Sequence, residues 1–145
     1  MSCQTVFTTL PCEDQRLMVS RQGRPDSRRR VLVVDDEAAI RTLLTVFLES
    51  RQFAVRTAPD GASALALLQT EPAEVILVDW HMPGINGLDM AIEVRRTNPH
   101  IPIALMTGTP KAIQPATLQQ VGISRIFVKP FDLEELFAWI RALLL

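Results

Sequence analysis

The sequence predicts an α/β fold in which five helices cover a doubly wound, five-stranded parallel sheet. After Arg30, short β-rich runs alternate five times with amphipathic helical stretches. Two of the runs, 31–35 and 74–80, are almost continuously apolar, which is typical of strands buried on both faces. The first ends in Asp35, and the second has Asp79 as its last residue but one. The 145 residues leave room for one such domain and a tail.

The first two strands are expected at 31–35 and 53–58, and the third at 74–80. The helix after the first strand has one apolar face, made of Ile40, Leu43, Leu44, Phe47 and Leu48. The next helix opens at Asp60-Gly61, and we expect Asp60 to be its N-cap. A third helix follows Gly87.

The fourth and fifth strands are expected at 101–108 and 125–130. The helix between them, within 111–121, either starts near Pro115 or is kinked there, because proline fits the first turn of a helix and breaks its interior. The last helix begins at Asp132, with Glu135 three positions later as a capping box. Phe137 and Trp139 on this helix are interpreted as packing or surface contacts.

Charge divides the chain into a basic N-terminal extension, 1–29, and a domain, 30–145. Residues 1–30 carry a balance of +3 and the remainder −4. The extension lacks aromatic residues between its arginines, so we expect a solvated, poorly ordered leader, and nucleic acid is not the expected partner. Cys3 and Cys12 are interpreted as inert thiols. The absence of a long apolar run or a signal-peptide pattern predicts a cytoplasmic protein that does not enter a membrane.

Polar residues end the predicted strands: Asp35-Asp36 the first, Asp79 the third, Thr107 the fourth and Lys129 the fifth. The carboxyl ends of parallel strands form the functional crevice of such sheets, so we expect these side chains to converge. Grouped carboxylates repel one another unless a hard cation lies among them, and Mg²⁺ prefers oxygen ligands. A lysine ammonium suits a phosphoryl oxygen.

The motifs VLVVDDE, VDWHMPGINGLDM, MTG and FVKPF resemble the response-regulator receiver family, in order and spacing, across residues 31–145. The spacing is 43 residues from Asp36 to Asp79, 28 from Asp79 to Thr107 and 22 from Thr107 to Lys129. These spacings are similar to those of that family. The resemblance implies a flavodoxin-like receiver fold and a signalling switch of a two-component system, not an enzyme acting on other molecules. It also implies that a histidine kinase or a histidine phosphotransfer protein donates the phosphoryl group. The identity of the output partner and the formation of a homodimer stay open.

The resemblance further implies individual roles. Asp79 would accept the phosphoryl group, and Asp36 and Asp79 would bind Mg²⁺ with the backbone carbonyl of His81. Asp35 would act mainly through metal-bound water. Thr107 would hydrogen-bond the phosphoryl group, and Lys129 would pair with one of its oxygens, with a cis Lys129-Pro130 bond. The His81 and Trp80 side chains are expected at the mouth of the site.

Ile126 and Pro115 depart from the family pattern. Ile126 lies where the family often has a rotating aromatic residue or histidine, so the usual route to the output face is in question. Two other functions stay open: a pseudo-receiver that only docks partners, and, with less support, a phosphoaspartate-using phosphatase. The latter needs Asp-x-Asp after its first strand, whereas here the first-strand acids are adjacent. A flavin-binding protein is disfavoured because DDEAAI would repel phosphate.

Overall fold

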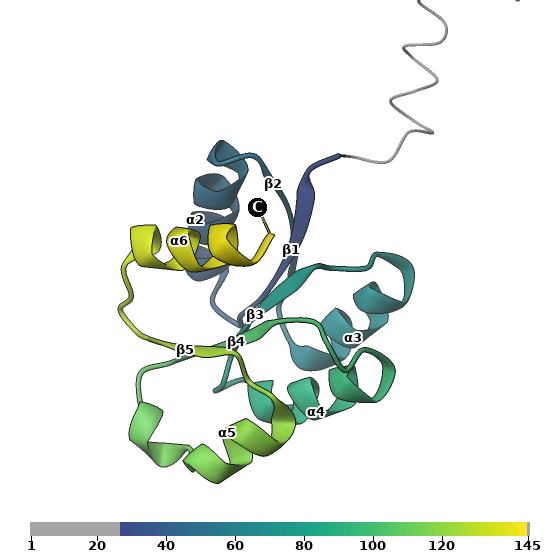
Figure 1. Ribbon diagram of the computed structural model, residues 1–145, viewed down its shortest axis with the longest axis vertical. Coiled ribbons are helices and arrows are strands. Elements are labelled where there is room, and N and C mark those ends of the chain that lie inside the picture. The colour runs from purple at the N-terminus through teal and green to yellow at the C-terminus, as the bar shows by residue number, and fades with distance from the viewer. Residues whose placement is uncertain (1–26, 145) are drawn as a thin grey trace, which may run out of the picture.

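The computed structural model describes residues 27–144, which form a single parallel sheet with helices on both faces (Figure 1). Its strands lie in the order β2-β1-β3-β4-β5. Their bounds are β1 (Arg29–Val34), β2 (Phe53–Ala58), β3 (Val75–Asp79), β4 (Ile103–Thr107) and β5 (Arg125–Val128). Every neighbouring pair is parallel, so the predicted fold class is confirmed.

Helices follow the strands in alternation. They are α2 (Ala38–Ser50), α3 (Gly61–Thr70), α4 (Gly87–Thr97), α5 (Pro115–Val121) and α6 (Leu133–Leu144), with a 3₁₀ turn, η2, at Pro110–Ala112. In Figure 1, α2 and α6 cover one face of the sheet and α3, α4 and α5 the other. No helix in the described part of the chain has the length and apolar character needed to cross a membrane.

The core is divided by the sheet into two apolar layers. Alternate residues of a strand point to opposite faces, so Leu32 and Val34 of β1 join the layer under α3 and α4. Val31 and Val33 join the layer under α2 and α6. The strands β3 and β4 are buried throughout, which explains why their sequences are continuous apolar runs. This rigid centre carries the strand ends where the polar residues lie.

The first strand begins at Arg29, two residues before the predicted start. The Arg29 guanidinium pairs with the Glu74 carboxylate at 2.8 Å, and the Arg30 backbone N–H donates to the same carboxylate. The predicted boundary between extension and domain therefore falls inside β1. Residues 1–26 of the predicted extension, with both cysteines, lie outside the described residues.

Two predicted helix starts are confirmed. The Asp60 carboxylate accepts the backbone N–H of Ser63 and caps α3. Pro115 occupies the first turn of α5, so the helix starts there and is not kinked. This helix ends at Gly122, whose φ of 79° lies in the left-handed region that favours glycine.

The predicted capping box of α6 is half wrong. Asp132 does cap the helix, because its carboxylate accepts the Glu134 backbone N–H at 2.8 Å. The Glu135 carboxylate instead accepts from the Arg125 guanidinium at 2.7 Å. A charged donor from β5 competes successfully with the neutral backbone N–H that a capping box would use.

Arg95 joins the ends of α4 and α5. Its guanidinium donates to three backbone carbonyls: Val121 at 2.9 Å, Gly122 at 2.7 Å and Asn98 at 3.2 Å. The first two are among the carbonyls at the end of α5 that have no partner within the helix. Arg95 therefore fixes the short α5 against the longer α4.

Replacing Arg95 with methionine should lower the free energy of unfolding by about 1–3 kcal/mol, because it leaves helix-end carbonyls without their charged donor. Urea unfolding measures the effect. The matched control is Arg96→Met on the next residue, which within residues 27–144 makes one exposed ion pair, with Glu93 at 3.8 Å. That change should stay within about 0.5 kcal/mol. Equal losses in the two variants would contradict the role given to Arg95.

Candidate phosphoryl-acceptor and metal site

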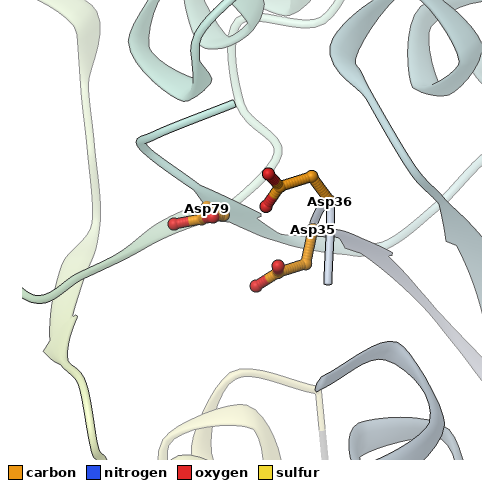
Figure 2. A group of neighbouring side chains, drawn as sticks. All are labelled: Asp35, Asp36 and Asp79. Carbon is orange, nitrogen blue, oxygen red and sulfur yellow. The ribbon is translucent and has the colours of Figure 1, made fainter. Parts of the chain in front are cut away.

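The polar strand ends meet at one edge of the sheet. Asp35 follows the last residue of β1, Asp79 ends β3 and Thr107 ends β4. Because β1 and β3 are neighbours, oxygen atoms of Asp35, Asp36 and Asp79 lie within 4.8 Å of one another. Figure 2 shows the Asp35 and Asp36 side chains leaving the end of β1 on the side where Asp79 lies. The predicted convergence of the three acids is present in the structure.

The Asp79 carboxyl group is buried, with 5% of the residue exposed. Burial, then the negative charge of Asp35, raises the pKa of Asp79 to about 6, against the opposing effect of Lys129. The neighbouring helix comes unusually close to this residue, because a Cβ on Gly87 would lie 2.5 Å from the Asp79 backbone oxygen. Gly87 therefore allows α4 to begin directly against the end of β3.

Lys129 lies among the carboxylates. Its Nζ is 3.0 Å from Asp35 Oδ2, 3.4 Å from Asp79 Oδ1 and 3.9 Å from Glu37 Oε1. Burial alone would lower the pKa of Lys129, but the hydrogen bond to Asp35 and the charges of Asp35 and Asp79 raise it overall. The Lys129-Pro130 bond is cis, as predicted.

The Thr107 hydroxyl is completely buried and belongs to a chain of hydrogen bonds. Thr107 Oγ1 accepts the Thr109 backbone N–H at 2.9 Å and lies 3.3 Å from Thr109 Oγ1. Thr109 Oγ1 is in turn 3.0 Å from His81 Nε2. These contacts connect the loop after β4 with the loop after β3.

The mouth of the site is an open pocket of about 540 Å³, lined by Asp36, Trp80, His81, Met82, Pro83 and Asn86. The predicted placement of the Trp80 and His81 side chains at this mouth agrees with that lining. Their rings lie 4.6 Å apart between centroids. Trp139, by contrast, packs edge-on against Phe127 at 5.7 Å, so it is part of the apolar layer under α6.

The donor set fits a hard cation. Three carboxylates lie together, and one of them, Asp36, is exposed to the pocket. The Lys129 ammonium contacts the other two, Asp35 and Asp79. Burial and the charge of Asp35 together keep the pKa of Asp79 raised in spite of this lysine, so further positive charge would stabilise the carboxylate. Oxygen ligands of this kind suit Mg²⁺.

The family model of the response regulator receiver domain matches residues 31–141. The chain belongs to this family. Among curated relatives, a probable transcriptional regulator, ycf27, from Guillardia theta is 36% identical over 119 residues, which cover 82% of this chain and 46% of that protein. The response regulator MprA of Mycolicibacterium vanbaalenii is 35% identical over 115 residues, covering 79% of this chain and 50% of MprA. This receiver chain thus spans about half the length of the curated relatives that it matches.

Solved receiver structures agree with this assignment. The Vibrio cholerae chemotaxis protein CheY4 superposes with a TM-score of 0.74 at 31% identity, covering 81% of this chain and 100% of CheY4. The Thermotoga maritima response regulator TrrA, solved in complex with Mg²⁺-BeF, gives a TM-score of 0.73 at 32% identity, covering 80% of this chain and 99% of TrrA. The flavodoxin-like receiver fold and the response-regulator family are confirmed.

Two contributors to the site were not predicted from the sequence. Thr109 joins Thr107 to His81, and the Arg41 guanidinium donates to the Asp35 backbone oxygen at 2.7 Å. The signal for Thr109 is a hydroxyl residue two positions after Thr107, a spacing at which a threonine side chain can accept a backbone N–H. Arg41 has no comparable local signal, because arginine is common on exposed helices.

The raised pKa of Asp79 predicts that the ionised carboxylate lowers the free energy of unfolding, and that this loss depends on pH. Since its folded value of about 6 lies above the ordinary 3.8, the folded protein holds this proton more tightly than the unfolded chain does. The stabilising effect of that proton is present below about pH 4 and is lost as pH rises to about 6. Without metal, Asp79→Asn should therefore be more stable than the wild type by about 1–3 kcal/mol at pH 7.5, and nearly equal to it at pH 4.

Urea unfolding in chelator across this pH range measures the difference. The control is Asp60→Asn, because the backbone hydrogen bond from Ser63 lowers the pKa of Asp60 and so gives the opposite sign. Its carboxylate stabilises the fold above the ordinary pKa, so the asparagine variant should gain nothing as pH rises. An Asp79→Asn advantage that does not change with pH would refute the buried-charge argument.

Proposed function

We propose that this receiver domain is a Mg²⁺-dependent switch that accepts a phosphoryl group on Asp79. The observation that carries the proposal is a buried carboxylate at a strand end, with a lysine ammonium 3.4 Å away and two further carboxylates beside it. A nucleophile in this setting needs charge neutralisation and positioning, which are the main requirements of phosphoryl transfer.

In the proposed reaction, an Asp79 carboxylate oxygen attacks phosphorus. The new O–P bond forms while the bond from phosphorus to the donor's nitrogen or oxygen breaks, and the leaving group keeps that electron pair. Lys129 binds a phosphoryl oxygen through its ammonium group. The Thr107 hydroxyl donates a hydrogen bond to another phosphoryl oxygen and moves toward it, leaving its present contacts with Thr109.

Asp35, Asp36, Asp79 and the His81 backbone carbonyl are the proposed Mg²⁺ ligands, with Asp35 acting mainly through water. The bound cation supplies positive charge that offsets the repulsion between an acidic site and an anionic phosphoryl group. The TrrA structure in complex with Mg²⁺-BeF supports this choice, because TrrA shares the fold and 32% of its aligned residues with this chain. The side chain of His81 is proposed to shield the site from attacking water.

The proposed donor is a histidine kinase or a histidine phosphotransfer protein, in keeping with the family. The pseudo-receiver alternative has less support, because the acceptor, the further acids, the hydroxyl and the lysine are present together. Two curated relatives are named as a transcriptional regulator and a response regulator, but the output of this chain stays open. We also propose that the functional unit is the receiver domain, predicted to begin at residue 30 and extended to Arg29 by the start of β1.

Incubation with Mg²⁺ and acetyl phosphate should add the mass of one phosphoryl group to the intact protein, because the small donor needs no docking partner. Chelation should abolish the adduct, and Asp79→Asn should remove it at this site. Mass spectrometry of the intact protein, followed by peptide mapping, measures both. Equal labelling of the asparagine variant would show that Asp79 is not the acceptor.

The two tryptophans provide an independent optical test. Trp80 adjoins Asp79 at the mouth, so Mg²⁺ binding should change its emission, and phosphodonor should change it further. Trp139 lies on α6 and packs against Phe127 of β5, so it should not respond to Mg²⁺ alone. Emission is recorded in Trp80→Phe and Trp139→Phe variants. A Mg²⁺ response that survives in Trp80→Phe and vanishes in Trp139→Phe would contradict a cation site beside Asp79.

A further inference from the structure

Arg41 reaches back from the first turns of α2 to the loop that bears the site acids. Its Nη1 donates to the Asp35 backbone oxygen at 2.7 Å, while its own backbone N–H donates to Glu37 at 3.2 Å. The side chain therefore spans the short loop between β1 and α2. Asp35 is completely buried, so this carbonyl is held by a charged donor in a position with little access to water.

The rest of the loop is fixed around Asp35. Its backbone N–H donates to Ala58 at 3.2 Å, and its Oδ1 accepts the Glu37 backbone N–H at 2.9 Å. Glu37 is the N-cap residue of α2 and makes no side-chain cap bond, so the Asp35 carboxylate satisfies one of the free N–H groups at this helix end. Contacts of Asp35 thus hold both ends of the loop.

Asp36 differs from its neighbour. It is exposed, and within residues 27–144 no hydrogen bond or ion pair holds its side chain. The position from which its carboxylate reaches the site is therefore set by the backbone of the loop. Whatever fixes the Asp35 carbonyl also fixes the peptide unit that joins Asp35 to Asp36, and with it the start of the Asp36 side chain.

We propose that Arg41 is a positioning residue that holds the β1–α2 loop so that Asp36 faces the cation. This inference rests on the proposed Mg²⁺ site. The two roles that Arg41 could have, as a nearby charge or as a positioning residue, predict opposite effects of its removal on Mg²⁺ affinity. As a nearby positive charge it would weaken Mg²⁺ binding, so its removal would tighten binding. As a positioning residue it orders a ligand in advance, so its removal loosens binding.

Calorimetric titration with Mg²⁺ at pH 7.5 distinguishes the two. Arg41→Met should weaken Mg²⁺ binding by about three- to tenfold, since bonds that orient a metal ligand carry part of the affinity. Arg41→Lys, which keeps a donor and the charge, should recover part of the loss. The matched control is Arg51→Met, which removes the same charge from the other end of α2, where Arg51 pairs with Glu134. It should leave Mg²⁺ affinity unchanged.

Urea unfolding in chelator is measured beside the titration, because a merely structural residue would lower stability without changing Mg²⁺ affinity. Unchanged or tighter binding in Arg41→Met would overturn the proposal. If that variant does not fold, Arg41→Gln takes its place with the same expected and contradicting results. Absence of Mg²⁺ binding in the wild type would instead overturn the proposed metal site, so the two failures are distinguishable.

Discussion

Mutual repulsion among Asp35, Asp36 and Asp79 is the physical constraint on which the site depends. Their oxygens lie within 4.8 Å of one another, and two of the residues are buried away from screening water. Lys129 offsets part of the repulsion through its contacts with Asp35 and Asp79. Burial of the carboxyl group, together with the remaining repulsion from Asp35, raises the pKa of Asp79 to about 6. The same repulsion that costs stability without a cation would favour the binding of a cation, and then of an anionic phosphoryl group, in the proposed function.

The sheet makes such a costly arrangement possible. Strands β1 and β3 are central, and their alternating residues fill both apolar layers, so their ends can move little. Asp79 is the last residue of β3 and Asp35 follows β1 directly, which places them at the buried ends of these two strands. Asp36, His81 and Thr109 stand on exposed loops instead. The molecule therefore combines a buried residue as the proposed acceptor with surrounding side chains on exposed loops.

The sequence was sufficient where local pattern decides the structure, and insufficient where distant residues meet. Apolar runs ending in acids located the strands and brought Asp35 and Asp79 to one edge. The start of β1 at Arg29 could not be predicted, because its stabilising partner, Glu74, lies 45 residues away. Local spacing predicts a capping box for Glu135, but the Arg125 guanidinium on β5 donates to its carboxylate instead. The Arg41 contact spans only six residues, but an arginine on a helix carries no local signal that it will donate to the buried Asp35 carbonyl.

Ile126 and Thr107 differ in how they could transmit a change at the proposed acceptor, Asp79, to the surface. Ile126 is half-buried against the apolar layer under α3 and α4, and a branched aliphatic side chain cannot make the wide swing of an aromatic ring. Thr107, in contrast, has a polar connection to the surface through Thr109 and His81. Movement of its hydroxyl toward Asp79 would stretch that chain and disturb two exposed loops. A change at Asp79 would therefore be transmitted to the surface through the polar loops after β3 and β4 more readily than through the Ile126 side chain.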